Sequence, residues 1–306
     1  MRITANMTAD NALYNIQQQR QTLDALQEQA SSGNLVNRPS DNPLSTRQIL
    51  DIQNQIASGD QYNSNIQKAQ LLLNVSSTAL NSMGDIMTQV KQIAGKFASG
   101  STDSTAIAGA VSNLTQLKGQ LIDLGNTQYG DQYVFGGFKN GQPFDAAGNF
   151  TGTSDSLNIP ISSSSQVSTS VSGGNLLRGG TPPAAVGSGA TAGNQPVDVL
   201  GGIDALITAI STNNTSAIND GIKNMKAGSD QLNASISDVA GRLTRLSNMQ
   251  SMITNNQNTL KDAYGNLQNV DLAKVGVQLS QQTTAFNAAL STTAKLTQLS
   301  LLDYMQ

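Results

Sequence analysis

Apolar residues recur at helical spacing at both ends of the chain. Near the N-terminus, gaps of three, seven, three and four residues separate Leu13, Ile16, Leu23, Leu26 and Ala30. This spacing predicts an amphipathic helix over residues 7–31, with Gly33 as its stop. A similar stripe near the C-terminus consists of Leu272, Val275, Leu279, Phe286, Ala289, Leu296, Leu299 and Leu302. Both ends of the chain are therefore predicted to be helices with one apolar face.

A much longer helical pattern follows the first helix. Apolar spacing continues from Leu44 to Ala98, and at ~1.5 Å per residue such a helix would extend roughly 80 Å. A helix of this length needs a partner along most of its course. A returning antiparallel helix is predicted over residues 107–124, where apolar residues alternate at gaps of three and four. The helical pattern resumes after Val197.

The segment from Lys139 to Val197 has a different composition. Four of its residues are charged, and 25 of 59 are Gly, Ser or Thr. The short runs LNIPI (157–161) and VSTSV (167–171) alternate as strands do. The predicted fold class is therefore mainly α: a long antiparallel helical rod with paired terminal coiled-coil helices and a small β insertion domain.

Aromatic residues concentrate just before and within this segment. Six of the twelve Tyr and Phe residues lie between Tyr129 and Phe150. Among them, Tyr133, Phe135 and Phe138 are spaced as on a strand, and we expect them to pack the rod against the insertion.

The stretch NLVNRPSDNPLS (34–45) separates two of the longest helical patterns. Pro39 pushes the residue before it away from helical angles. Ser40 or Asp41 can cap the next helix, and Pro43 suits its first turn because an N–H there is unbonded in any case. Spacing alone favours a simple helix–helix turn over a linker between two layers.

Composition narrows the function further. Charged residues make up 12% of the chain, against a usual value of about 25%, and the net charge is −3. This charge gives no basic footprint for nucleic acid. The absence of Cys and His removes disulfides and the commonest members of zinc sites and acid–base relays. We identify no catalytic, cofactor-binding or metal-binding constellation, so we predict that the protein is not an enzyme.

Membrane and secretion signals are missing as well. No stretch approaches the roughly 18 to 20 apolar residues of a membrane span. The polar N-terminal segment has no apolar core of a cleavable secretory signal.

The two ends are poor in charge. The first 32 residues carry five charges and the last 41 carry four, yet both ends keep an apolar stripe. Two such helices can bury one stripe against the other and still leave faces that suit side-by-side packing with further copies. We infer that the termini form an assembly domain, although periodicity fits an ordinary coiled coil within one chain equally well.

Five segments carry a family resemblance. They are NRPSDNPLSTRQILDIQNQI (37–56), GDQYVFGGFKNGQPF (130–144), DVAGRLTRL (238–246), VDLAKVGVQLSQQTTAFNAAL (270–290) and LTQLSLLDYMQ (296–306). Together they resemble the flagellin superfamily and, within it, the FlgL-type hook-associated proteins of the hook-filament junction. The resemblance covers residues 1–144 and 197–306, and it is weak in the β insertion.

The resemblance implies a structural axial protein of the bacterial flagellum, forming the hook-filament junction ring on which the flagellin filament assembles. It divides the chain into a terminal coiled-coil assembly domain (1–32 and 266–306), a spoke linker (33–43), a helical rod domain (44–138 and 198–265) and a β-rich insertion domain (139–197). The implied partners are further copies of the chain, the other hook-filament junction protein, flagellin and a cytosolic export chaperone. No cofactor, nucleic acid or membrane insertion is implied. The implied location is the extracellular flagellum, reached through the flagellar type III apparatus without a cleavable signal.

The resemblance also assigns roles to residues. The assembly interface is expected to comprise Leu13, Ile16, Leu23 and Leu26 with Leu272, Val275, Leu279, Phe286, Ala289, Leu296, Leu299 and Leu302. The spoke linker is expected to depend on Gly33, Pro39, Asp41 and Pro43. Arg242, which lies near Arg245 on a rod helix, either pairs with an acidic neighbour or lies on a solvated face.

Two other functions stay open at this point. Flagellin itself is the main alternative, but flagellins usually open with an INTN-like segment and end on Arg, whereas this chain begins MRIT and ends LLDYMQ. A non-flagellar type III secretion coiled-coil tip protein would share the long helices, but it would not explain the motifs at both termini.

Overall fold

The computed structural model describes residues 5–101, 103–139, 141–180 and 196–304, apart from the side chains of residues 5, 6, 8, 9 and 296–304. The chain divides into two compact units. We call Met1–Ser58 with Asn255–Gln306 the terminal unit, and Gly59–Thr254 the central unit. Two long helices, α2 (Pro43–Lys96) and α7 (Thr215–Gln268), contribute residues to both.

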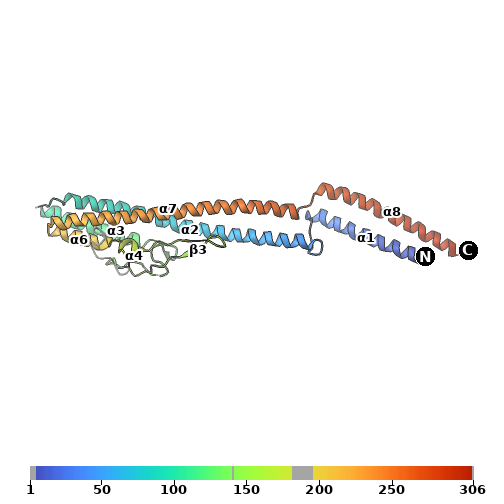
Figure 1. Cartoon of the computed structure of the whole chain (residues 1–306), viewed down its shortest axis with the longest axis horizontal. Helices are drawn as coiled ribbons and strands as arrows, with labels where there is room; N and C mark the ends of the chain where they lie inside the picture. Colours follow the sequence, from blue (N-terminus) through green and yellow to red (C-terminus); the bar gives the residue numbers. More distant parts are fainter. Residues whose placement is uncertain (1–4, 102, 140, 181–195, 305–306) are drawn as a thin grey trace. The chain divides into compact units, whose positions relative to one another are not determined.

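The terminal unit brings the two ends of the chain together. Figure 1 shows α1 (Ala5–Ser32) beside α8 (Leu272–Tyr304), with both chain ends at the same end of the pair. The two helices run antiparallel, as the N–H of Val270 donates to the Gly33 carbonyl at the opposite end. The start of α2 and the end of α7 form a second antiparallel pair in this unit.

The central unit holds the hydrophobic core. Its helices are the remaining parts of α2 and α7 together with α3 (Ser104–Gly125) and α6 (Val199–Ser211). Apolar side chains of all four helices meet in one buried cluster, whose fully buried members include Leu73, Leu80, Met83, Leu114, Leu121, Ile203, Leu206, Met225 and Leu232. The three-and-four spacing of the α3 leucines explains why this helix turns one face to the core.

Side-chain caps fix where α3 and α6 begin. The Asp103 carboxylate accepts the N–H of Thr105 at 2.9 Å, and the Asp198 carboxylate accepts the N–H of Gly201 at 2.9 Å. Each cap satisfies backbone donors that the first turn of a helix leaves unpaired.

Two small antiparallel sheets lie just before and within the insertion. β1 (Gln128–Tyr129) pairs with β2 (Gln132–Tyr133), and β3 (Asn158–Pro160) pairs with β4 (Gln166–Ser168) with Ile159 opposite Val167. The short helix α4 (Gly173–Leu177) follows. Strands this short need a helical scaffold to support them.

The expectation of a mainly α fold with a small β insertion is confirmed. The first helix spans Ala5–Ser32 where residues 7–31 were predicted, and both predicted strand segments contain a strand. The composition of residues 179–196, rich in Gly, Pro and Ala, predicts a loose connector, and this segment lies mostly outside the described residues.

Candidate assembly interface

The seam between α1 and α8 uses part of the predicted apolar stripe. On α1, the side chains of Ile16, Leu23 and Leu26 are half-buried. On α8, the half-buried residues are Leu279, Phe286 and Ala289, and Val275 is buried. The two ends of the chain therefore form a helical pair within one molecule, and most of the seam keeps contact with solvent.

Other apolar residues of the terminal unit lie outside this seam. Leu13 is 56% exposed and Leu272 is 60% exposed. Tyr14, Val277 and Leu290, which the periodicity did not select, are exposed as well. The structure therefore brings only part of the predicted stripe together in the seam.

The last three residues of the predicted stripe are Leu296, Leu299 and Leu302, all in α8. Their side chains lie outside the described residues.

The terminal unit buries little apolar surface for its size. Among its described residues, the buried hydrophobic side chains are Val36, Ile49 and Val275. Contiguous exposed apolar surface on a soluble protein marks interaction sites. The two terminal helices thus present both a seam and free apolar side chains for a further contact.

The segment between α1 and α2 is held by main-chain and amide hydrogen bonds. Gly33 adopts a φ of 71°, a left-handed conformation that glycine takes without strain, and it ends α1. The N–H of Leu35 donates to the Gln268 carbonyl at 2.6 Å, and Gln268 Nε2 donates to the Val36 carbonyl at 3.3 Å. From the other side, Gln29 Nε2 donates to the Leu35 carbonyl at 3.0 Å. These bonds tie the linker to α1 and to the end of α7.

The prolines of the linker lie where the sequence indicates. Pro39 lies within a turn over residues 38–41, in which the Asp41 carboxylate accepts the N–H of Arg38 at 2.9 Å. Helix α2 begins at Pro43. The expected cap is wrong: Asn42 Oδ1 accepts the N–H of Ser45 at 3.1 Å, whereas Asp41 is used inside the turn that precedes the helix.

The three aromatic residues expected between rod and insertion have different environments. Phe135 is fully buried in the core of the central unit. Tyr133 is half-buried in β2, and Phe138 is 58% exposed.

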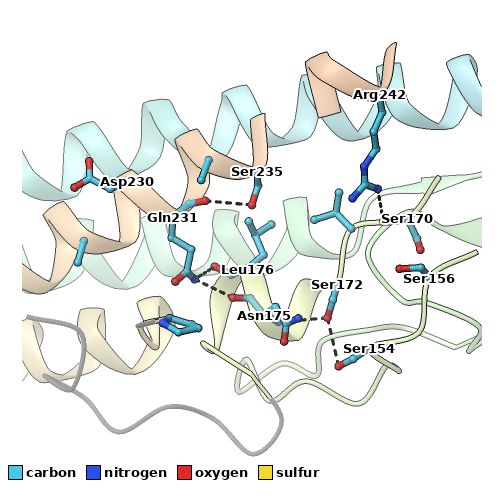
Figure 2. A pocket seen from close by; sticks show the side chains of 14 residues that line it. Ser154, Ser156, Ser170, Ser172, Asn175, Leu176, Asp230, Gln231, Ser235 and Arg242 are labelled. Atoms are coloured by element: carbon cyan, nitrogen blue, oxygen red, sulfur yellow. Dashed lines mark hydrogen bonds between the residues drawn. The ribbon is translucent and has the colours of Figure 1, made fainter. Parts of the chain in front are cut away.

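Polar side chains of α7 contact the insertion, as Figure 2 shows for Arg242 and Gln231. Arg242 Nη1 donates to the carbonyls of Ser168 and Ser170, each at 3.1 Å, and the guanidinium also pairs with Asp238 one turn away. Of the two readings left open by the sequence, the structure has the acidic partner for Arg242. The two carbonyl contacts were not predicted.

Gln231 makes more contacts of this kind. Its Nε2 donates to the carbonyls of Asn175 and Leu176 at 2.9 and 2.8 Å (Figure 2). Its Oε1 accepts the N–H of Val197 at 2.9 Å. One amide therefore joins α4, Val197 just before α6, and α7. Gln231 carried no sequence signal, because Gln and Asn recur along the whole chain and no motif singles this residue out.

One buried ion pair supports this region of the central unit. Arg178 Nη1 lies 3.3 Å from Asp198 Oδ2, and the Asp198 side chain is 5% exposed. Burial raises the pKa of the Asp198 carboxyl, although the Gly201 N–H and the Arg178 guanidinium act in the opposite direction. The pair is structural, because Asp198 also caps α6.

Neither a metal centre nor a membrane helix emerges from the described residues. They contain no group of three acidic side chains that could hold a metal ion. Within the same residues, every helix is too short or too polar to cross a membrane.

Comparison with known proteins gives a match for the N-terminal part of the chain. Residues 3–140 match the family model described as the bacterial flagellin N-terminal helical region. No curated protein matches the chain in a sequence search. The match agrees with the resemblance found in the sequence over this part, which is a little less than half of the chain.

Solved structures show which fold the chain has. The flagellar junction protein FlgL from Legionella pneumophila aligns with a TM-score of 0.58 and 14% identity over 72% of this chain and 99% of that chain. FlgL from Bacillus cereus aligns with a TM-score of 0.57 and 16% identity over 69% of this chain and 97% of that chain. A Vibrio parahaemolyticus protein named as a flagellar hook-associated protein aligns with a TM-score of 0.64 and 18% identity. The alignment covers 75% of this chain and 100% of that chain. The chain has the FlgL-type fold.

Proposed function

We propose that this protein is a structural axial component of the bacterial flagellum that forms the hook-filament junction. The carrying observation is the paired α1 and α8, which share a half-buried seam and keep exposed apolar side chains such as Leu13 and Leu272. The flagellin N-terminal match and the FlgL-type fold supply the context. The role is one of assembly and support, not of catalysis.

The mechanism follows from incomplete burial. Helices that bury one weak seam lack the apolar contact needed to offset their conformational entropy. Docking against α1 and α8 of neighbouring copies supplies the missing surface, so these helices become fully ordered as the copies join. The predicted stripe of both helices is the proposed contact between subunits, including Leu296, Leu299 and Leu302.

The proposal also gives roles to the other parts of the chain. The spoke linker (33–43) connects the assembly domain (1–32 and 266–306) to the rod domain (44–138 and 198–265), and the insertion (139–197) extends from the rod. In the linker, Gly33, Pro39, Asp41 and Pro43 fix the turn. In the rod, Phe135 and the half-buried Tyr133 are the proposed contacts with the insertion, whereas Phe138 is 58% exposed and does not fit this role.

The proposed partners are further copies of this chain, the other hook-filament junction protein and flagellin. We place the protein outside the cell in the flagellum, after export through the flagellar type III apparatus without a cleavable signal. A cytosolic export chaperone covers the apolar face of α8 before export, since an exposed apolar helix promotes aggregation.

A deletion strain tests the function. Cells that lack this protein are examined by electron microscopy and motility, and flagellin is assayed in the medium. Hooks without filaments, with flagellin released to the medium, are expected. Retained filaments would refute the junction role, and loss of flagellin itself from the medium would support the flagellin alternative.

A truncation tests the proposed interface. Removal of residues 296–306 is expected to leave the central unit folded by circular dichroism while filaments fail to form in the complemented deletion strain. The control replaces the exposed Ser291 and Thr292 of the same helix with Ala and is expected to restore filaments. Normal filaments from the truncated protein would show that the C-terminal stripe is dispensable.

A further inference from the structure

The turn after β2 is fixed to the insertion, yet it leaves an aromatic side chain in water. The N–H of Phe138 donates to Thr153 Oγ1 at 3.0 Å. Lys139 Nζ donates to the Thr151 carbonyl at 2.7 Å. Gly137 has a φ of 66°, and a Cβ there would collide with the Thr153 carbonyl, so this close approach requires glycine. Phe138 is 58% exposed although its main chain is held in place, so its exposure is a property of the fixed turn.

Phe138 borders an open groove of about 630 Å³ in the central unit. Its lining is mainly apolar and comes from α2, β1, the turn after β2 and the segment that contains β3: Leu71, Leu72, Tyr129, Phe138, Leu157 and Ile159. We call this the aromatic groove. In the described part of the central unit, four large hydrophobic side chains are exposed, and three of them, Leu71, Tyr129 and Phe138, line this groove. Such a concentration of exposed apolar side chains marks an interaction site.

The charged residues of the groove are two lysines and one aspartate, Lys68, Lys139 and Asp131. All three are exposed, and none of them forms an ion pair with another described residue. The groove thus carries a net positive charge, although the whole chain has a net charge of −3. The ammonium of Lys139 has three donors and uses one of them for the Thr151 carbonyl, so it can still bind an anion. An apolar surface with exposed cations favours a partner that combines apolar side chains with carboxylates.

We propose that the aromatic groove binds an acidic segment of a partner protein, in which carboxylates flank a large apolar side chain. The apolar side chain packs against Leu71, Tyr129 and Phe138, and the carboxylates pair with Lys68 and Lys139. An open groove leaves much of its ligand in water, which suits a segment of a larger protein, whereas small-molecule sites enclose roughly 70–90% of the ligand surface. The contact goes beyond the proposed function, because it uses none of the residues of the candidate assembly interface.

Three synthetic peptides with blocked termini test this chemistry on the purified full chain. The first is Gly-Glu-Phe-Leu-Glu-Gly, the second has Lys in place of both Glu residues, and the third has Gly in place of Phe and Leu. Titrations followed by saturation-transfer difference NMR measure each Kd. We expect the first peptide to bind at least about tenfold more tightly than either of the others, because it alone matches both the apolar lining and the lysines. Its binding should weaken as salt is added, since the lysines are exposed.

Substitutions at exposed positions assign the binding to the groove. Phe138→Ser removes the fixed aromatic side chain, and we expect the first peptide to bind about tenfold more weakly. Lys68→Glu leaves one lysine against two carboxylates in the groove, so the preference for the acidic peptide over the basic one should be lost. The matched controls are Met252→Ser and Lys261→Glu, which change an exposed hydrophobic residue and an exposed lysine outside the groove. Both controls should bind the first peptide as the wild type does.

Three results of these titrations would overturn the proposal: no binding of the acidic peptide, equal binding of the acidic and basic peptides, or binding that Phe138→Ser leaves unchanged. Phenylacetate bound as tightly as the acidic peptide would make the groove a site for small carboxylates instead. Sedimentation of the purified chain tests for a second copy as the occupant. Self-association that Phe138→Ser abolishes would assign the groove to a contact between copies and would likewise overturn the proposal.

Discussion

The two units of this molecule treat their apolar residues in opposite ways. The central unit encloses leucines such as Leu80 and Leu114 completely, whereas the terminal unit leaves Leu13 and Leu272 more than half exposed. Both units consist of helices with apolar spacing. The difference is the number of layers around each stripe: several helices surround the core of the central unit, while α1 has α8 alone as its long neighbour. Burial, and not helical pattern, therefore separates a self-sufficient unit from one that needs further copies.

Matched leucine substitutions should make this contrast measurable. Leu114→Ala removes a fully buried side chain, and we expect the free energy of unfolding of the isolated chain to fall by about 2–5 kcal/mol. Leu13→Ala should change it by no more than about 0.5 kcal/mol, because the side chain is mostly in water. Urea denaturation followed by circular dichroism measures both. Equal effects at the two sites would break the comparison.

The main effect of Leu13→Ala should be on assembly and not on the free energy of unfolding. In the complemented deletion strain, this variant is expected to form fewer filaments than the wild type. Leu114→Ala chains that are still folded at the growth temperature should be incorporated.

The attachment of the insertion to α7 should have an intermediate effect. Gln231→Leu leaves the N–H of Val197 and the carbonyl of Leu176 without their partner, and both residues are buried. Unpaired buried groups of this kind cost about 1–3 kcal/mol. The control is Gln250→Leu, because Gln250 accepts only from the side chain of Gln70, which can turn to water. Hydrogen exchange of residues 173–180 should accelerate in the first variant and stay unchanged in the second.

The smallest expected effect is the pH response of Asp198. Its pKa is raised on folding from an ordinary value of 3.8, so the folded chain takes up a proton more readily than the unfolded chain. The stabilisation from this uptake is complete below 3.8 and is lost as the pH rises through the raised pKa. Asp198→Asn keeps a residue that can cap α6 but removes the titration.

Urea unfolding of wild type and Asp198→Asn over a pH series tests this sign. The stability of the wild type relative to the variant should decrease as the pH rises through that window. A relative stability that increases with pH would show that the ion pair with Arg178 outweighs the burial of Asp198.

Periodicity predicted the helices well because amphipathic spacing reports which face is apolar. It placed the first helix and the long α2 within about two residues of their ends, which is the usual accuracy for helix boundaries. It also located β3 and β4, because the alternating runs around Ile159 and Val167 lie in a segment too rich in Ser and Gly for an amphipathic helix.

The same spacing could not say how deeply each residue is buried. Ile16 and Leu13 belong to one stripe, yet Ile16 is half-buried in the seam and Leu13 is exposed. The stripe is wider than the surface that a single partner helix covers, and spacing alone does not count partners. For this reason the sequence could predict which helices form the candidate assembly interface. It could not predict which apolar residues pack in the seam between α1 and α8 and which stay exposed.

Sequence patterns also could not identify the side-chain amides that hold the tertiary arrangement. Gln231 and Gln268 donate to main-chain carbonyls of residues far away in sequence, and Gln29 donates to the carbonyl of Leu35 in the linker. In a chain so rich in Gln and Asn, nothing local distinguishes these three from solvated neighbours. Asn42 likewise replaced Asp41 as the cap of α2 because the Asp41 carboxylate was already used by the preceding turn.

Hydrogen exchange of the isolated chain and of the same chain assembled in flagella tests the central claim most directly. In the isolated chain, the amides of α1 and α8 should exchange rapidly while those of α3 and α6 are protected. After assembly, α1 and α8 should become protected, and α3 and α6 should change little. Terminal helices that are as protected as α3 in the isolated chain, and unchanged by assembly, would contradict the account.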